Sequence, residues 1–165
     1  MKKKIVHTCE ITSYSSEKEL SEDLQILLKK AREALKSSYS PYSGFQVGAA
    51  LKLSTGEIVL GSNQENIAYP SGLCAERTAI FSAGTNYANI PIESIAIVAK
   101  SLNGEVNQPV TPCGACRQVM IEVETKQNSI ITMVTAGDDG EIWVSDSIAN
   151  IIPFYFSSAV VGRVK

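Results

Sequence analysis

Ile95-Ala96-Ile97-Val98-Ala99 is an uninterrupted apolar run, and it decides the fold of this chain. A short run of this kind is typical of a strand buried on both faces at the centre of a sheet. Before it in the chain, residues 74–83 have the alanine, isoleucine and phenylalanine content of a buried helix. After it in the chain, Thr111-Pro112 predicts a helix cap followed by proline at the first helical position, with the helix continuing to about residue 124.

The rest of the chain continues this alternation of helices and strands. Leucine and alanine recur at helical spacing over 20–35, and either Ser16 or Ser21 could cap that helix. Residues 1–15 carry little periodic signal and could form a loose arm or an added edge strand. The order of elements predicts one mixed sheet covered on both faces. The remaining strands are expected over 47–53, 57–61, 130–134 and 142–144, with a short helix over 145–151.

Length and composition predict a single domain. The chain has 165 residues, of which 44% are hydrophobic and 19% charged, so a core can form. We expect one catalytic domain over 1–165, with an N-terminal extension over 1–19 and a C-terminal tail over 157–165. The formal net charge of -2 offers no basic surface for a phosphate backbone, which argues against nucleic acid as a partner. No apolar stretch is long enough to span a bilayer, so we expect no membrane partner and a cytoplasmic location.

Three cysteines open the two helices that flank the central strand. Cys74 starts the first helix, and Cys113 and Cys116 share one face at the start of the second. Helix N-termini favour thiolate over thiol, as metal binding requires. Three protein ligands leave the fourth position of a tetrahedral Zn²⁺ for water, which is typical of catalytic rather than structural zinc. We therefore predict a zinc site, and the alternative of ordinary buried cysteines fits this spacing poorly. Cys9 lies outside the pattern, and the sole histidine, His7, excludes histidine-based triads.

The residues beside the first cysteine complete the predicted chemistry. Glu76 follows Cys74 by two positions, where it could move the proton of an activated water. The alternative is a first-turn glutamate that only favours the helix dipole. Three thiolates and one Zn²⁺ leave a net charge of about −1. Arg77 is the stronger candidate to offset this charge through hydrogen bonds to thiolates, and Arg117 is the other.

Five segments carry a resemblance to a known family. They are Cys74-Ala-Glu-Arg-Thr-Ala-Ile80, Pro112-Cys-Gly-Ala-Cys-Arg-Gln-Val119, Ser40-Pro-Tyr-Ser-Gly-Phe-Gln-Val-Gly-Ala-Ala50, Gly61-Ser-Asn-Gln-Glu-Asn-Ile-Ala-Tyr-Pro70 and Ile151-Ile-Pro153 with Phe156. Together they resemble the zinc motifs and substrate-binding segments of the cytidine deaminase family, over about residues 20–156. A glutamate that is not a metal ligand is part of the wider zinc-deaminase signature.

The resemblance implies both a fold and a reaction. The fold is a three-layer α/β/α sandwich with a five-stranded mixed sheet. The reaction is the zinc-dependent hydrolytic deamination of free cytidine and deoxycytidine to uridine and deoxyuridine, with release of ammonia, as a step of pyrimidine salvage. Small members of the family are usually homotetramers whose sites are completed by neighbouring subunits, so a second copy is the expected partner. The implied substrate-binding residues are Phe45, Asn63, Glu65, Tyr69, Phe156 and the main chain at Ala75.

The residues alone leave other possibilities open. Asn63 and Glu65 are alternate residues at a strand end and suit sugar hydroxyls, but a turn cap and a solvated carboxylate would have the same spacing. A deaminase of another aminopyrimidine, such as a nucleoside antibiotic, would share the motifs. A zinc-stabilised binding protein without catalysis would share the cysteines. A polynucleotide-editing enzyme is disfavoured by the negative net charge.

Overall fold

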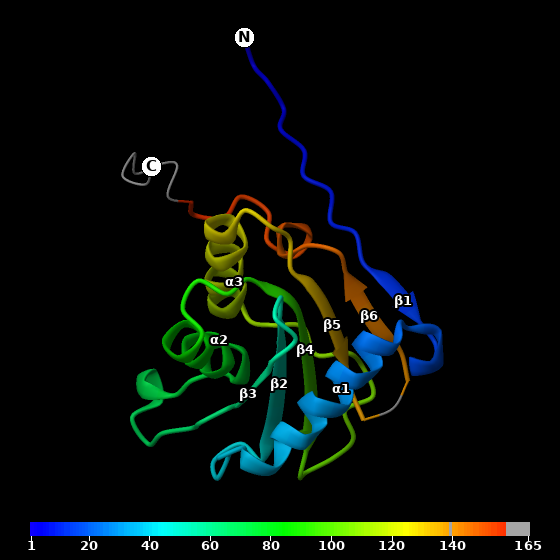
Figure 1. Ribbon diagram of the computed structural model, residues 1–165, viewed down its shortest axis with the longest axis vertical. Helices are drawn as coiled ribbons and strands as arrows, with labels where there is room; N and C mark the ends of the chain where they lie inside the picture. The colour runs from blue at the N-terminus through cyan, green and yellow to red at the C-terminus, as the bar shows by residue number, and fades with distance from the viewer. Residues whose placement is uncertain (139, 158–165) are drawn as a thin grey trace.

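The protein is described by a computed structural model that covers residues 1–138 and 140–157 (Figure 1). The tail predicted over 157–165 therefore lies outside the described residues, except for residue 157. In the described part, no helix is both long enough and apolar enough to cross a membrane.

A single mixed sheet forms the centre of the molecule. Its strand order is β1-β6-β5-β4-β2-β3, and only the pairing of β4 with β5 is parallel. The apolar run 95–99 lies within β4, between β5 and β2, as its composition predicted. The strands are β1 (Thr12–Tyr14), β2 (Phe45–Leu53), β3 (Ile58–Ser62), β4 (Ile92–Ser101), β5 (Thr132–Ala136) and β6 (Ile142–Ser145).

The expectation of five strands was wrong, because the described sheet has six. The added strand is β1, which pairs antiparallel with β6 through the register Thr12↔Val144 to Tyr14↔Ile142. Backbone hydrogen bonds define this strand, and its three residues are too few and too polar to give a period-two hydrophobic pattern. The N-terminal segment thus supplies an added edge strand at 12–14.

Helices cover both faces of the sheet (Figure 1). α1 packs on one face, where its buried leucines and alanines meet Ala50, Ala96 and Val134. α2 and α3 pack on the other face, against residues such as Leu51, Ile97 and Met133. Neighbouring strand residues therefore point into different cores, as strand geometry requires. The helices are α1 (Glu22–Ala34), α2 (Ala75–Asn86) and α3 (Gly114–Gln127), with short 3-10 helices η1 (Glu17–Glu19), η2 (Leu35–Ser37), η3 (Tyr69–Ser71) and η4 (Ile148–Ile151).

The helix starts decide between the expected caps. Ser21 caps α1, and its hydroxyl accepts from the backbone N–H of Leu24, whereas Ser16 caps η1. The expectation that Thr111 caps α3 was wrong, because Cys113 is the N-cap and the helix begins one residue later. The Thr111 hydroxyl instead accepts a hydrogen bond from Arg117. Both predicted helices at the cysteine segments therefore start immediately after a cysteine, since Cys74 is the N-cap of α2.

A glycine sets how closely α2 approaches the sheet. A Cβ built on Gly61 in β3 would lie 2.5 Å from the carbonyl oxygen of Ala75 and 2.5 Å from the N–H nitrogen of Ala79. Such distances are far inside van der Waals contact, so only glycine permits this packing. The close approach places the N-terminal end of α2, and with it Cys74, against the sheet.

We expect Gly61→Ala to lower the free energy of unfolding by about 1–3 kcal/mol, because α2 must move away from β3. Gly84→Ala is the matched control. Gly84 lies in α2, the helix that Gly61 contacts, and a Cβ added there meets no atom of the described chain within 4 Å. That control should raise stability by about 0.4–1 kcal/mol. Urea unfolding curves measure both changes, and equal stability of the Gly61 variant and the wild type would contradict the packing argument.

Candidate active site

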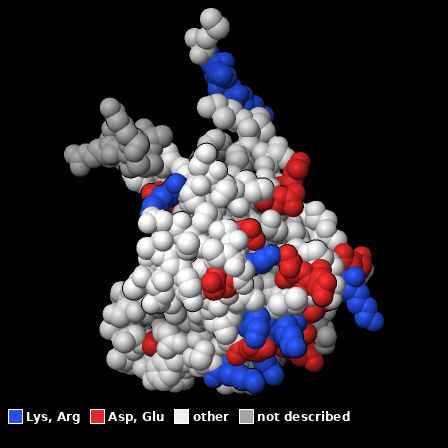
Figure 2. Space-filling model, viewed as in Figure 1, with Lys and Arg blue, Asp and Glu red and all other residues white. Residues whose placement is uncertain are grey.

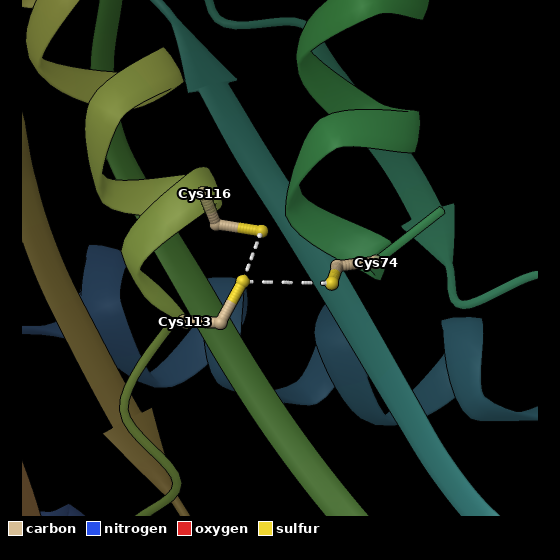
Figure 3. A group of neighbouring side chains, drawn as sticks. All are labelled: Cys74, Cys113 and Cys116. Atoms are coloured by element: carbon tan, nitrogen blue, oxygen red, sulfur yellow. Dashed lines mark hydrogen bonds between the residues drawn. The ribbon is translucent and has the colours of Figure 1, made fainter. Parts of the chain in front are cut away.

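The three predicted metal ligands lie together between the N-terminal ends of α2 and α3. Figure 3 shows their sulfur atoms pointing toward one another. The Sγ of Cys113 lies 3.8 Å from that of Cys74 and 3.5 Å from that of Cys116, and all three sulfurs lie within 4.8 Å of one another. Cys116 is fully buried, while Cys9 is exposed and outside the cluster.

These separations fit a tetrahedral zinc ion. With Zn–S bonds of about 2.3 Å, two sulfurs of a tetrahedron lie about 3.8 Å apart. The Cys113 distances bracket this value, although Cys74 and Cys113 come from different helices. The free N–H groups at both helix starts add partial positive charge near the thiols. The cluster is therefore built to hold a thiophilic cation.

The thiols do not share one protonation state. The neighbouring Cys116 thiol and the Arg77 guanidinium lower the pKa of Cys74 to about 5, although burial opposes the shift. The same interaction with Cys74, together with burial, raises the pKa of Cys116 above its usual range. At neutral pH Cys74 is therefore a thiolate, while Cys116 holds its proton until a cation replaces it.

Arg77 is the guanidinium that contacts the thiols. Its Nη2 donates to the Sγ of Cys74 at 3.7 Å, and its buried Nε has no hydrogen-bond partner among the described residues. The other candidate, Arg117, donates to Pro112, Thr111 and Ile151 instead, so its electrostatic role at the thiols is the weaker of the two. Arg77 thus supplies the positive charge beside the anionic cluster.

Glu76 lies in the first turn of α2, next to the cluster in sequence. Its side chain is 4% exposed, and burial is the main cause that raises its pKa, with the nearby Cys74 charge acting in the same direction. A raised pKa makes a carboxylate a stronger base and brings its proton exchange closer to neutral pH, which suits general acid–base catalysis.

A cavity of about 650 Å³ opens above these residues, a volume in the range of small-molecule sites. Cys74, Cys113 and Glu76 form part of its wall, so the cluster and the acid face the same space. The remaining wall comes from the loop before β2 and the start of that strand, the segment after β3, the middle of β4 and the segment before α3. Its further lining residues include Tyr42, Phe45, Val47, Asn63, Glu65, Tyr69, Ile97, Val110 and Thr111.

Asn63 and Glu65 both line this cavity and both hold the loop that precedes β2. The Asn63 side chain accepts from Ser38 Oγ and Val47 N–H and donates to the carbonyl of Phe45. The Glu65 carboxylate accepts from the backbone N–H groups of residues 42 and 43 and from the Ser43 hydroxyl, and these bonds lower its pKa. Within the described chain, one N–H of Asn63 and about one lone-pair site of Glu65 remain free.

Comparison with known proteins assigns this arrangement to a family. The family model described as "Cytidine and deoxycytidylate deaminase zinc-binding region" matches residues 21–132, more than half of the chain. The chain belongs to this deaminase family. The curated cytidine deaminase of Halalkalibacterium halodurans is 43% identical over 124 residues, which are 75% of this chain and 89% of that protein. The one from Sporosarcina psychrophila is 37% identical, over 82% of this chain and 92% of that protein.

Solved structures agree with the family assignment. The crystal structure of cytidine deaminase from Burkholderia pseudomallei superimposes with a TM-score of 0.70 at 37% identity, and the match covers 83% of this chain and 100% of that chain. The Mycobacterium tuberculosis cytidine deaminase structure gives 0.64 at 28% identity, over 83% and 99%. The fold of this deaminase-family member thus matches these solved cytidine deaminases over nearly their full length.

The aromatic residues expected at the substrate site divide into two groups. Phe45 and Tyr69 line the cavity, and Tyr69 also packs edge-on to Tyr42 with ring centroids 6.1 Å apart. Phe156 does not line the cavity and is 66% exposed. Its backbone is held by Gln118, which donates to its carbonyl at 2.8 Å and accepts from its N–H at 3.3 Å. Ala75 is fully buried behind the cavity wall.

Sequence reasoning missed the residues that build the cavity from the side of β4. The cavity lining includes Ile97, which belongs to the apolar run of β4. It also includes Val110 and Thr111, which lie in the irregular segment between β4 and α3. Ser38 also escaped notice, although it donates a 2.6 Å hydrogen bond to Asn63. The position of Thr111 two residues before a ligand cysteine was the one available signal.

Proposed function

We propose that this deaminase-family member catalyses hydrolytic deamination of cytidine and deoxycytidine to uridine and deoxyuridine, with release of ammonia, in pyrimidine salvage. The observation that carries the proposal is the placement of three converging thiols beside one cavity, whose wall includes Cys74, Cys113 and the buried Glu76. The relatives named cytidine deaminase, at 37–43% identity over most of their length, support the choice of substrate. We assign zinc to Cys74, Cys113 and Cys116.

The residues of the chain would divide the reaction between them. Zinc, when bound, supplies a water of lowered pKa as the nucleophile at neutral pH. Glu76 would accept a proton from that water and deliver protons to N3 of the cytosine ring and to the departing amine. Arg77 would offset the thiolate charge through its contact with Cys74. Uridine and ammonia together account for every atom of cytidine and the water.

Zinc binding should become tighter as pH rises. Cys116 holds a proton at neutral pH because its pKa is raised, and binding must release that proton. Cys74 contributes little proton release above pH 6, since its pKa of about 5 already makes it a thiolate. We expect the apparent affinity to rise about tenfold per pH unit for each proton released between about pH 6 and pH 8. Chelator competition at several pH values measures the zinc affinity. An affinity that does not change with pH would contradict the assignment of Cys116 as a zinc ligand.

The sugar would be held by Asn63 and Glu65. A hydroxyl group both accepts and donates, so one hydroxyl matches the free N–H of Asn63 and the free lone pair of Glu65. We assign this contact to the ribose 3′-hydroxyl, as the resemblance implies. Phe45 would lie against the nucleoside, and the main chain at Ala75 would hold the pyrimidine edge together with Glu76.

We expect Glu65→Gln to lower kcat/KM for cytidine by about 10–100-fold, mainly through KM, because a hydrogen bond to a charged group is lost. A comparison with 3′-deoxycytidine separates sugar binding from damage to the loop. The kcat/KM of the wild type should fall by a similar factor when 3′-deoxycytidine replaces cytidine. The already lowered kcat/KM of the variant should fall little further. If the two losses multiply fully, Glu65 does not bind that hydroxyl.

We also propose that the protein is a homotetramer whose sites are shared between subunits. Phe156 and Tyr69 expose 66% and 74% of their surface, and such exposed aromatic side chains suit contact with a second copy. In the view of Figure 2, charged side chains gather over α1, while the surface around α2 carries few of them. Phe81 of α2 is 49% exposed there. Sedimentation equilibrium tests the assembly, and a monomer at micromolar concentration would contradict it.

A substrate panel tests the proposed specificity. Cytidine and deoxycytidine should be converted, and single-stranded DNA should be neither bound nor edited, as the net charge of -2 indicates. Preferred turnover of a nucleoside antibiotic would shift the assignment to another aminopyrimidine. If the protein holds zinc but converts no member of the panel, the alternative of a zinc-stabilised binding protein without catalysis would be favoured.

A further inference from the structure

Arg117 lies directly after the ligand Cys116 but turns away from the thiols. Its guanidinium donates three hydrogen bonds, from Nε to the carbonyl of Pro112 at 2.7 Å, from Nη1 to the carbonyl of Ile151 at 2.8 Å, and from Nη2 to the Thr111 hydroxyl at 3.1 Å. Two of these acceptors belong to the two residues that immediately precede Cys113. The third belongs to a distant part of the chain.

Among the described residues, the side-chain hydrogen bonds to Thr111 and Pro112 come from Arg117, while the carbonyl of Val110 just before them accepts from the buried Thr135 hydroxyl at 2.6 Å. Cys113 is exposed, and as the N-cap of α3 its side chain makes no capping hydrogen bond to the helix. Pro112 has no backbone N–H, so its carbonyl is its only main-chain hydrogen-bonding group. Residues 102–113 form no helix or strand between β4 and α3. The last step of the chain from Val110 to Cys113 is therefore held mainly by the Arg117 contacts.

The far side of the Arg117 contact is rigid. Ile151 ends η4 and is 5% exposed. The other end of η4 is fixed by Glu124 of α3, a carboxylate 8% exposed that accepts from the N–H of Ile148 at 2.9 Å and from the Ser147 hydroxyl at 2.7 Å. Glu124 also accepts from the N–H of Ile131 at 2.8 Å, which links η4 to the start of β5. Arg117 thus joins the segment before Cys113 to a helical turn that Glu124 holds in place.

We propose that Arg117 is a positioning residue that fixes Cys113 for zinc by clamping Thr111-Pro112 to η4. This inference rests on the zinc site of the proposed function. Only an arginine can do it, because the planar guanidinium presents donors in several fixed directions at once, whereas a lysine ammonium at the same charge cannot reach the three acceptors together. The contribution is therefore geometric, and preserving the positive charge alone does not preserve it.

The test compares Arg117→Lys and Arg117→Ala with the wild type in the zinc-loaded full chain. Zinc release into excess chelator is followed under native conditions, and the visible spectrum of the cobalt-substituted protein reports the coordination geometry. We expect both variants to release zinc about 10–100-fold faster, the range for residues that orient metal ligands. Both should show altered cobalt bands, and added guanidinium should slow release from the alanine variant. Arg32→Lys is the control, since Arg32 pairs with Glu17 far from the cysteines.

Each outcome decides a different point. A zinc release rate of Arg117→Lys within twofold of the wild-type rate overturns the proposal, because the positive charge alone, without the planar guanidinium, would then suffice. Unchanged cobalt bands with a lowered melting temperature also overturn it, since Arg117 would be merely structural. A wild type that binds no zinc refutes the proposed function instead. If the alanine variant does not fold, the lysine variant and Thr111→Val, which removes one acceptor, carry the test.

Discussion

Glu76→Gln should reduce the turnover of cytidine by about 10³- to 10⁴-fold while the protein keeps its zinc, because the amide cannot accept and release the proton that moves during the reaction. The substitution preserves the shape of a side chain that is 4% exposed. Burial disfavours the charged carboxylate at this position, so replacing it with a neutral amide should not lower stability. The loss then belongs to the chemical step rather than to unfolding.

Glu122→Gln is the matched control for this substitution. Glu122 is an exposed glutamate of α3 outside the cavity, and its replacement should leave turnover, zinc content and melting temperature unchanged. Zinc content is measured on the same samples as uridine formation. A Glu76→Gln variant that retains more than about a tenth of wild-type kcat would contradict the role of Glu76 as proton carrier, since general acid–base catalysis is worth far more.

Cys116→Ser should remove both zinc and activity. A serine hydroxyl does not ionise near neutral pH, so the site would offer two thiolates instead of three. Zinc affinity should fall by at least about 10²-fold, since each ligand carries a share of a large binding free energy. Cys116 is fully buried and its Sγ lies 3.5 Å from that of Cys113, so no other side chain of the described chain stands ready to replace it.

Cys9→Ser is the control for the cysteine substitution. Cys9 is exposed and lies outside the cluster, so this variant should bind one zinc per chain with unchanged affinity. Zinc content after dialysis and chelator competition distinguish the two variants. Wild-type zinc affinity in Cys116→Ser would show that the metal, if bound, is held elsewhere.

Elements with a strong hydrophobic pattern could be predicted from the sequence. The run 95–99 identified the central strand, and the leucine spacing over 20–35 identified α1, because burial imposes these patterns on the side chains themselves. The metal cluster could also be predicted, because a helix start places Cys113 and Cys116 on one face whatever else the chain does.

Features that depend on backbone pairing or on distant partners could not be predicted. For residues 1–15 the sequence left a loose arm and an added edge strand open, because β1 depends on the hydrogen-bonding groups at the edge of β6 and not on a pattern in Thr12-Ser13-Tyr14. Thr111 had the residue type of a helix cap, but a side chain six positions later uses its hydroxyl. Glu124 entered the sequence analysis only as the expected end of a helix, yet its carboxylate is buried and accepts hydrogen bonds from η4, far along the chain.

The most direct test of the account is the stoichiometry of the reaction. Zinc-loaded protein is incubated with cytidine, and uridine and ammonia are quantified together with bound zinc. We predict one uridine and one ammonia for each cytidine consumed, at a rate proportional to zinc content and absent after chelation. Protein that holds one zinc per chain but forms no uridine would contradict the central claim that the three cysteines and Glu76 form a deaminase site.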